Sequence, residues 1–159
     1  MTEDKDRHAE RIVAGVDGSP SSVAVLRWAL RQAHLTGATV DAVMAWQTPM
    51  MADGYAWAPV PMLDDYDFQG MAGKTLARVV GEVTDPGESV AVRQLVAEGK
   101  AARVLLDAAN GADLLVIGGH GHGGFTEALL GSVSQQCAHH APCPVVIIRG
   151  ERHEQHGTA

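Results

Sequence analysis

The residues best suited to binding chemistry lie in a glycine-rich stretch of the C-terminal half. Five glycines stand within residues 118–124, directly after an apolar run. Glycine lets the backbone adopt positive φ angles, so that consecutive N–H groups can turn toward an anion. Gly131 and Ser132 then begin a predicted helix, whose free N–H groups and positive dipole end favour phosphate. Together these features predict a phosphate-binding site, although a glycine loop on its own is more often just a tight turn.

The elements that position this loop are predicted from hydrophobic periodicity. Mostly apolar runs predict strands, and amphipathic segments predict helices. The predicted strands are 11–16, 40–46, 90–97, 113–118 and 145–149, and the predicted helices are 19–37, 64–83, 101–110 and 131–140. Strands that are apolar throughout and alternate with helices favour a five-stranded parallel sheet with helices on both faces, which is a doubly wound α/β fold. Ligands of such folds bind at the carboxyl ends of the strands, where Asp17 and Gly118 fall.

Length and composition favour one domain. The chain has 159 residues, of which 46% are hydrophobic, and we expect a domain at 11–149 between disordered tails at 1–10 and 150–159. The segment 47–61 holds three prolines and is predicted to be a functional or mobile loop.

Charge and residue usage exclude several function classes. The net charge is −7 without any basic block, which argues against nucleic-acid and anionic-membrane surfaces. No apolar run approaches the ~18 residues of a membrane helix, so a cytoplasmic protein is expected. Cys137 and Cys143 are predicted to be buried free thiols, because two cysteines make no disulfide framework.

The spacing of the glycines resembles that of a known family. Gly118-x2-Gly121-x9-Gly131-Ser132 resembles the G-x2-G-x9-G-[S/T] nucleotide motif of ATP-binding universal stress proteins. Residues 13–19 resemble the first strand of this family and its aspartate, and residues 141–148 resemble its last strand. The resemblance therefore covers 11–149 and implies a fold like that of the adenine nucleotide α-hydrolases.

The resemblance also implies a ligand, its contacts and an assembly. It implies a regulatory protein that binds ATP with Mg²⁺ and hydrolyses it slowly at most, and that forms a homodimer through the last strand, Val145–Ile148. Nucleotide occupancy would shift the ordering of the 47–61 loop, the glycine loop or the dimer surface. Gly15, Asp17 and Val43 would flank adenine and ribose, and Asp17, which serves equally well as a turn former before Ser19, is also a candidate Mg²⁺ ligand. The phosphates would be held by Gly118, Gly119, His120, Gly121, His122, Gly123, Gly124, Gly131, Ser132, Val133 and Ser134.

The histidines of the loop depart from the family pattern. Related proteins often carry arginines where this chain has His120 and His122. A neutral imidazole offers one donor and no full charge near pH 7, so we expect phosphate affinity to be weaker or pH dependent. A metal site built from these residues with His139 and His140 is disfavoured, because adjacent histidines on a helix face different ways.

Other motif-like patterns receive structural interpretations. Residues 70–75 resemble the end of a Walker A motif, but Phe68 stands where glycine is required, and no strand precedes. Asp64, Asp65 and Asp67 are interpreted as a solvated helix start. No catalytic residues are predicted, because no nucleophile stands beside a base. Two alternatives remain open: a nucleotide-free dimeric interaction module of the same fold, and an enzyme of the ATP pyrophosphatase or nucleotidyl transferase type.

Overall fold

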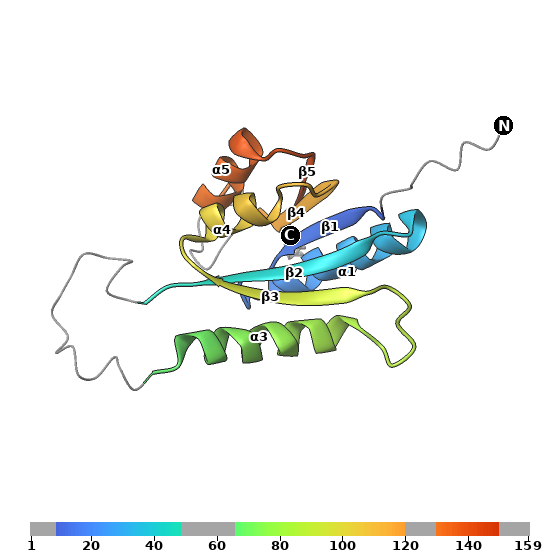
Figure 1. Cartoon of the computed structure of the whole chain (residues 1–159), viewed down its shortest axis with the longest axis horizontal. Helices are drawn as coiled ribbons and strands as arrows, with labels where there is room; N and C mark the ends of the chain where they lie inside the picture. Colours follow the sequence, from blue (N-terminus) through green and yellow to red (C-terminus); the bar gives the residue numbers. More distant parts are fainter. Residues whose placement is uncertain (1–8, 49–65, 120–129, 150–159) are drawn as a thin grey trace, which may run out of the picture.

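The computed structural model describes residues 9–48, 66–119 and 130–149, in which strands and helices alternate (Figure 1). The strands are β1 (Arg11–Gly15), β2 (Thr39–Trp46), β3 (Val92–Glu98), β4 (Leu114–Gly118) and β5 (Val145–Ile148). The helices are α1 (Pro20–Thr36), α3 (Phe68–Val83), α4 (Ala101–Ala108) and α5 (Ser132–His140). In the described part of the chain, no helix is long and apolar enough to cross a membrane.

The strands form one parallel sheet in the order β3-β2-β1-β4-β5. The chain first moves outward from β1 through β2 to β3, and then returns to the other side of β1 for β4 and β5. The strand order therefore reverses beside β1, and the carboxyl ends of β1 and β4 meet at the point where such folds bind ligands. The predicted fold class is confirmed.

Helix ends differ from the predicted ones for local reasons. Helix α3 begins at Phe68 rather than at residue 64, because Asp67 is its N-cap and accepts a hydrogen bond from the Gly70 N–H at 2.8 Å. Helix α4 ends at Ala108, two residues earlier than predicted. The stop that follows uses Gly111 at φ 75°, whereas Asn110 keeps an ordinary negative φ.

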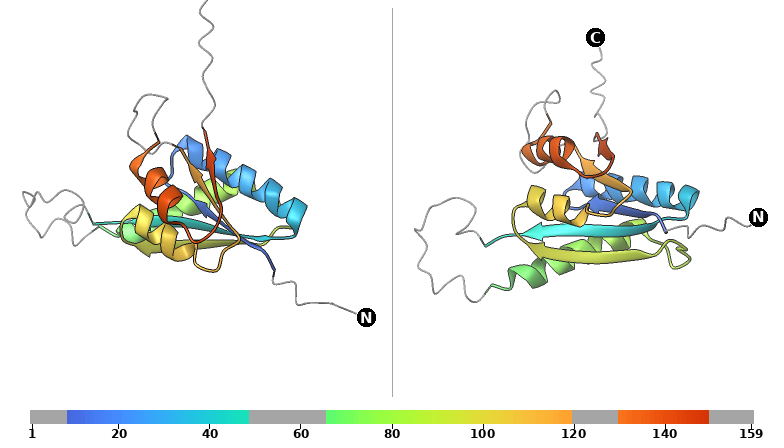
Figure 2. Two further views of the ribbon diagram at one scale, coloured as in Figure 1. Left: turned by 90° about the horizontal axis from the view of Figure 1, so that it is seen from above. Right: turned by 45° about the horizontal axis from the view of Figure 1, so that its top comes forward.

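Two hydrophobic cores lie on the two faces of the sheet, under the helices that Figure 2 shows on either side of it. Helices α1 and α3 cover one face, where Leu26 and Leu76 are buried against the strands. Helices α4 and α5 cover the other, which buries Leu115 and Cys137. Both cysteines are free, as predicted; Cys137 is fully buried, whereas Cys143 is only partly buried. Burial raises the pKa of the Cys137 thiol.

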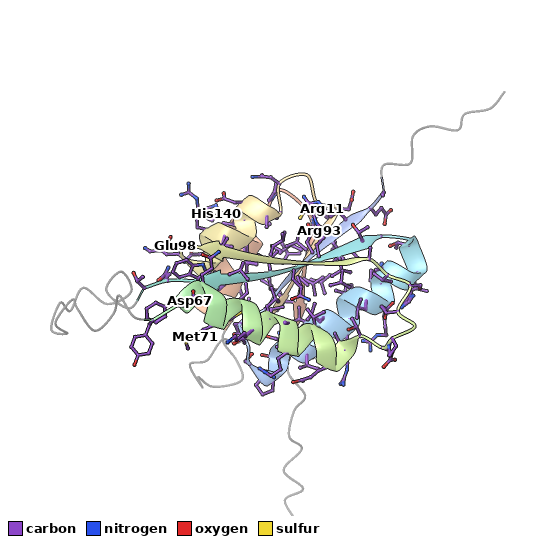
Figure 3. All side chains as sticks on the ribbon, turned by 60° about the horizontal axis from the view of Figure 1, so that its bottom comes forward. Arg11, Asp67, Met71, Arg93, Glu98 and His140 are labelled. Atoms are coloured by element: carbon purple, nitrogen blue, oxygen red, sulfur yellow. The ribbon has the colours of Figure 1, made fainter. Side chains whose placement is uncertain are left out.

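A buried carboxylate ties three strands and one helix together at the amino-terminal end of the sheet. The two arginines that bind it, Arg11 and Arg93, are labelled in Figure 3. Asp41 on β2 is 1% exposed and accepts from Arg93 Nε at 2.9 Å, Arg93 Nη2 at 2.7 Å and Arg11 Nη1 at 3.0 Å. Arg11 also donates to the carbonyls of Ala108 and Asn110 at the end of α4. Burial by itself raises the pKa of Asp41, but hydrogen bonds from Arg93 and Arg11 outweigh burial and hold the pKa below its usual range.

Replacing Asp41 with asparagine is expected to lower the free energy of unfolding by roughly 2–4 kcal/mol at pH 7, because two arginines lose a charged acceptor. The folded-state pKa lies below the unfolded one, so this stabilisation is complete above the unfolded value, about 4, and is lost as pH falls through the folded value. In urea titrations from pH 7 to 2.5, the difference in free energy of unfolding between wild type and Asp41→Asn should therefore shrink as the pH falls below about 4.

The matched control is Asp107→Asn, which removes an exposed carboxylate paired with Arg103 at 3.4 Å. Exposed pairs contribute little, so this variant should unfold almost like wild type. A destabilisation of Asp41→Asn that is the same at every pH would contradict the linkage.

Candidate functional site

A cavity of about 140 Å³ opens at the carboxyl ends of β1, β2 and β4, where the strand order reverses. The first turns of α1, α4 and α5 all border it. The lining residues come from strand ends and helix starts: Gly15, Val16, Asp17, Ser21, Ser22, Val25, Val43, Ala45, Ala101, Leu105, Ile117, Gly118, Gly131, Ser132, Val133 and Ser134.

The inner wall of the cavity is apolar and depends on Gly15. A Cβ atom on Gly15 would lie 3.1 Å from Leu105 Cδ1 and 3.2 Å from Ile117 Cγ2, so any larger residue requires these side chains to shift by a few tenths of an ångström. Val43 and Ala45 on β2 continue the wall. The Val16 N–H donates to the Val43 carbonyl at 2.9 Å, which extends the pairing of β1 with β2 one residue beyond the end of β1.

Asp17 organises the turn between β1 and α1. Its Oδ1 accepts from the Ser19 N–H at 2.9 Å, the Ser19 hydroxyl at 2.5 Å and the Ser22 hydroxyl at 2.8 Å. The Ser22 hydroxyl in turn accepts from the Asp17 N–H at 3.0 Å, and Gly18 adopts φ 83°. The turn-forming role considered for Asp17 is confirmed, and the same carboxylate lines the cavity.

Helix α5 presents its amino end to the cavity and is anchored to β4. The Gly131 N–H donates to the Gly119 carbonyl at 2.9 Å, and the buried Ser134 hydroxyl donates to the Gly118 carbonyl at 2.6 Å. Ser132 and Val133 lie in the first turn, where N–H groups have no acceptor within the helix. Because Ser134 gives its proton to Gly118, the backbone N–H groups and the Ser132 hydroxyl are the donors that this helix offers to a ligand.

The structure brings most of the predicted site residues together. Gly15, Asp17, Val43, Gly118 and 131–134 all line the cavity, and Gly119 adjoins it through its bond to Gly131. His120, Gly121, His122, Gly123 and Gly124 lie outside the described residues, as does most of the 47–61 loop.

Sequence reasoning missed half of the lining. The missed residues are Val16, Ser21, Ser22, Val25, Ala45, Ala101, Leu105 and Ile117. Two of them could have been predicted from the sequence. Ala45 lies two residues after Val43 and therefore on the same face of β2, and Ile117 immediately precedes Gly118. The contribution of Leu105 depends on how α4 packs against β1, which no local pattern indicates.

Alternative sites are disfavoured in the described part of the chain. Residues 70–75, which resemble a Walker A ending, lie inside α3, where the Gly70 N–H donates to the Asp67 side chain and the N–H groups further along are used by the helix. His139 and His140 sit exposed in the last turn of α5. No group of three or more metal-ligand side chains gathers among the described residues.

Comparison with known proteins identifies the family. The model described as "Universal stress protein family" matches residues 8–149. The chain belongs to the universal stress protein family. A universal stress protein of Mycobacterium tuberculosis strain H37Rv is 34% identical over 140 residues, covering 87% of this chain and 43% of the relative. One of Mycolicibacterium smegmatis is 33% identical over 150 residues, covering 92% and 49%. The chain thus spans less than half the length of these relatives.

Solved structures share the fold of this universal stress protein. A protein described as hypothetical, whose biochemical function was assigned from its structure, has a TM-score of 0.72 at 16% identity over 89% of this chain and 96% of its own. A universal stress protein in complex with cAMP has a TM-score of 0.57 at 22% identity, covering 90% and 98%. One from Archaeoglobus fulgidus in complex with dAMP has a TM-score of 0.51 at 21% identity, covering 89% and 98%.

The close packing around Gly15 predicts an unusual cost for a single methyl group. Gly15→Ala is expected to lower the free energy of unfolding by about 1–2 kcal/mol, because the new Cβ forces Leu105 and Ile117 apart. Gly73→Ala is the control, since its Cβ meets nothing within 4 Å in α3 and should stabilise by roughly 0.5–1 kcal/mol. Denaturant titration measures both, and equal effects would contradict the packing argument.

Proposed function

We propose that this universal stress protein binds ATP in the cavity and acts as a nucleotide-dependent regulator in the cytoplasm, where ATP is available. The observation that carries the proposal is the convergence of an apolar cavity and three helix starts at the reversal of strand order. The cAMP and dAMP complexes of two proteins with this fold support an adenine nucleotide as the class of ligand.

The apolar wall suits the adenine ring. Val43, Ala45 and Leu105 offer a surface without polar side chains, of the kind that binds flat aromatic rings in small-molecule sites. In the proposal the base lies against β2 and α4, which leaves the sugar and phosphates to the β1 and α5 side.

The phosphate end is served by backbone groups. The N–H groups of Ser132 and Val133 and the positive end of the α5 dipole attract an anion, and the starts of α1 and α4 add to this potential. In the proposal the 118–131 glycines continue the phosphate contacts.

Asp17 fits a magnesium-bound triphosphate better than a bare one. It is the one ionisable side chain among the described lining residues, and its negative charge repels phosphate. Carboxylate and hydroxyl oxygens are the ligands that Mg²⁺ prefers, so Asp17 with its neighbouring serines would hold the ion, and the ion would neutralise phosphate charge. The protein's own contribution is to position these oxygens and to exclude water from the apolar wall.

Regulation by occupancy, rather than turnover, fits the described side chains. Asp17 Oδ1 already accepts three hydrogen bonds, and no other described lining residue is a base that would activate water. In the proposal, ATP is therefore hydrolysed slowly at most, and the nucleotide-bound form of the protein is the regulatory state.

The first test is titration calorimetry of ATP with Mg²⁺, comparing wild type with Ala45→Leu. One ATP per chain is expected, and the larger side chain should weaken binding about tenfold or more by projecting into the cavity. The control is Ala97→Leu on β3, because Ala97 is the register partner of Ala45, packs against the same core and lies outside the cavity lining. Folded wild-type protein that binds no ATP would overturn the proposal. Equal ATP affinity of the two variants would show that ATP binds outside this cavity.

The proposal includes a homodimer formed through β5. This strand lies at one edge of the sheet, and its residues Val145–Ile148 are all apolar and all partly exposed. An apolar edge strand is a template for pairing, and a symmetric contact would cover it.

Sedimentation should therefore show a dimer that Val146→Lys converts to monomer, because a lysine on an edge strand blocks pairing. Leu95→Lys on β3, the opposite edge strand, is the matched control and should remain dimeric. A monomeric wild type at micromolar concentration, or a dimer lost equally in both variants, would contradict the β5 interface.

A further inference from the structure

Helix α3 contacts the Asp17 turn through residues that do not line the cavity. The Arg78 Nη2 donates to the Gly18 carbonyl at 3.3 Å, across 60 residues of sequence. Thr75, one turn earlier, packs so closely that a Cβ on Gly18 would lie 2.8 Å from its Cγ2 atom. Arg78 is exposed and Thr75 is partly buried, and neither residue lines the cavity.

The carbonyl that Arg78 binds belongs to a peptide group that also binds Asp17. The Gly18 C=O and the Ser19 N–H form one planar unit, so the orientation of one fixes the other. Arg78 donates to the oxygen of this peptide group, and the Ser19 N–H of the same group donates to Asp17 Oδ1 at 2.9 Å. Such chains of hydrogen bonds polarise one another, which strengthens the bond to the carboxylate.

Arg78 is itself held in place. Its Nη1 donates to Glu82 Oε1 at 2.6 Å, one helical turn further along α3. This pair is half exposed and adds little stability by itself, but it orients the guanidinium so that Nη2 reaches Gly18. Gly18 adopts φ 83°, and glycine has more backbone freedom than any other residue. The hydrogen bond from Arg78 to the Gly18 carbonyl therefore restricts the conformation of the turn.

We propose that Arg78 is a positioning residue for the nucleotide site, acting through the 18–19 peptide on the carboxylate of Asp17. The inference rests on the proposed function, since it assigns Asp17 to the magnesium and phosphate end of the ligand. It adds a residue from a helix that does not line the cavity. It also couples the position of α3 to ligand binding at the Asp17 turn. By reciprocity, a ligand bound at Asp17 stabilises the contact between Arg78 and Gly18.

The first arm of the test needs no nucleotide. Amide hydrogen exchange of the Ser19 N–H reports directly on its bond to Asp17. In Arg78→Gln, exchange at Ser19 should accelerate about 3- to 10-fold, the range expected for loss of one hydrogen bond. The control is Arg31→Gln, which removes an exposed arginine from α1 and should leave exchange at Ser19 unchanged. Unchanged exchange in Arg78→Gln would overturn the positioning role.

The second arm links positioning to binding through a double-mutant cycle. Affinity for ATP with Mg²⁺ is measured in wild type, Arg78→Gln, Asp17→Asn and the double variant. Arg78→Gln should bind about threefold or more weakly, and little further should be lost when Asp17 is already asparagine. Additive losses would show that Arg78 does not act through Asp17 and would overturn the inference.

Glu82→Gln separates positioning from simple attraction of the phosphates by a positive charge. If Arg78 acts only by its charge, removing the neighbouring carboxylate should tighten ATP binding. If Glu82 orients Arg78 toward Gly18, the same variant should weaken binding and speed exchange at Ser19. Tighter binding with unchanged exchange would overturn the proposal.

The two arms keep the two proposals apart. If folded wild-type protein binds no ATP, the proposed function fails and the role of Arg78 toward a nucleotide fails with it, whatever the exchange arm shows about the turn. If wild type binds ATP and Arg78→Gln binds it equally well, the proposed function stands and this inference is wrong.

Discussion

The parallel pairing of β1 with both β2 and β4 is the constraint on which the rest of the structure depends. It places the end of the first strand at the centre of the sheet, with the chain leaving in opposite directions on its two sides. The carboxyl ends of β1, β2 and β4 therefore lie at the same end of the sheet, and the first turns of α1, α4 and α5 border the cavity at this end. The cavity, the Asp17 turn and the amino end of α5 all follow from this arrangement.

Hydrogen bonds at this edge convert the arrangement into a defined surface. Ser134 fastens α5 to the last carbonyl of β4, and Asp17 fastens the start of α1 to the end of β1. At the other end of the sheet, Asp41 links β1, β2 and β3, and Arg11 donates to the Ala108 carbonyl at the end of α4. The sheet is thus fixed by charge at one end and by hydroxyl and backbone bonds at the end where a ligand would bind.

Local patterns predicted the strands, the fold class and the described glycines of the site, because apolar runs and turn residues are local signals. The role of Asp41 was not predicted, because this residue lies inside an apolar run and its partners Arg11 and Arg93 come from two other strands. Ser134 was predicted to be a ligand donor, but its proton is used by Gly118, which depends on how α5 docks. The contact between Arg78 and Gly18 joins residues 60 positions apart and has no local pattern.

In the proposed function the attraction for an anion comes from the backbone, because no described lining residue carries a basic side chain. The net charge is −7, and Asp17 is the one charged side chain among the described lining residues. Helix starts and glycine N–H groups offset this charge without requiring any particular side chain. A site of this kind would depend on the path of the backbone more than on the identity of its side chains.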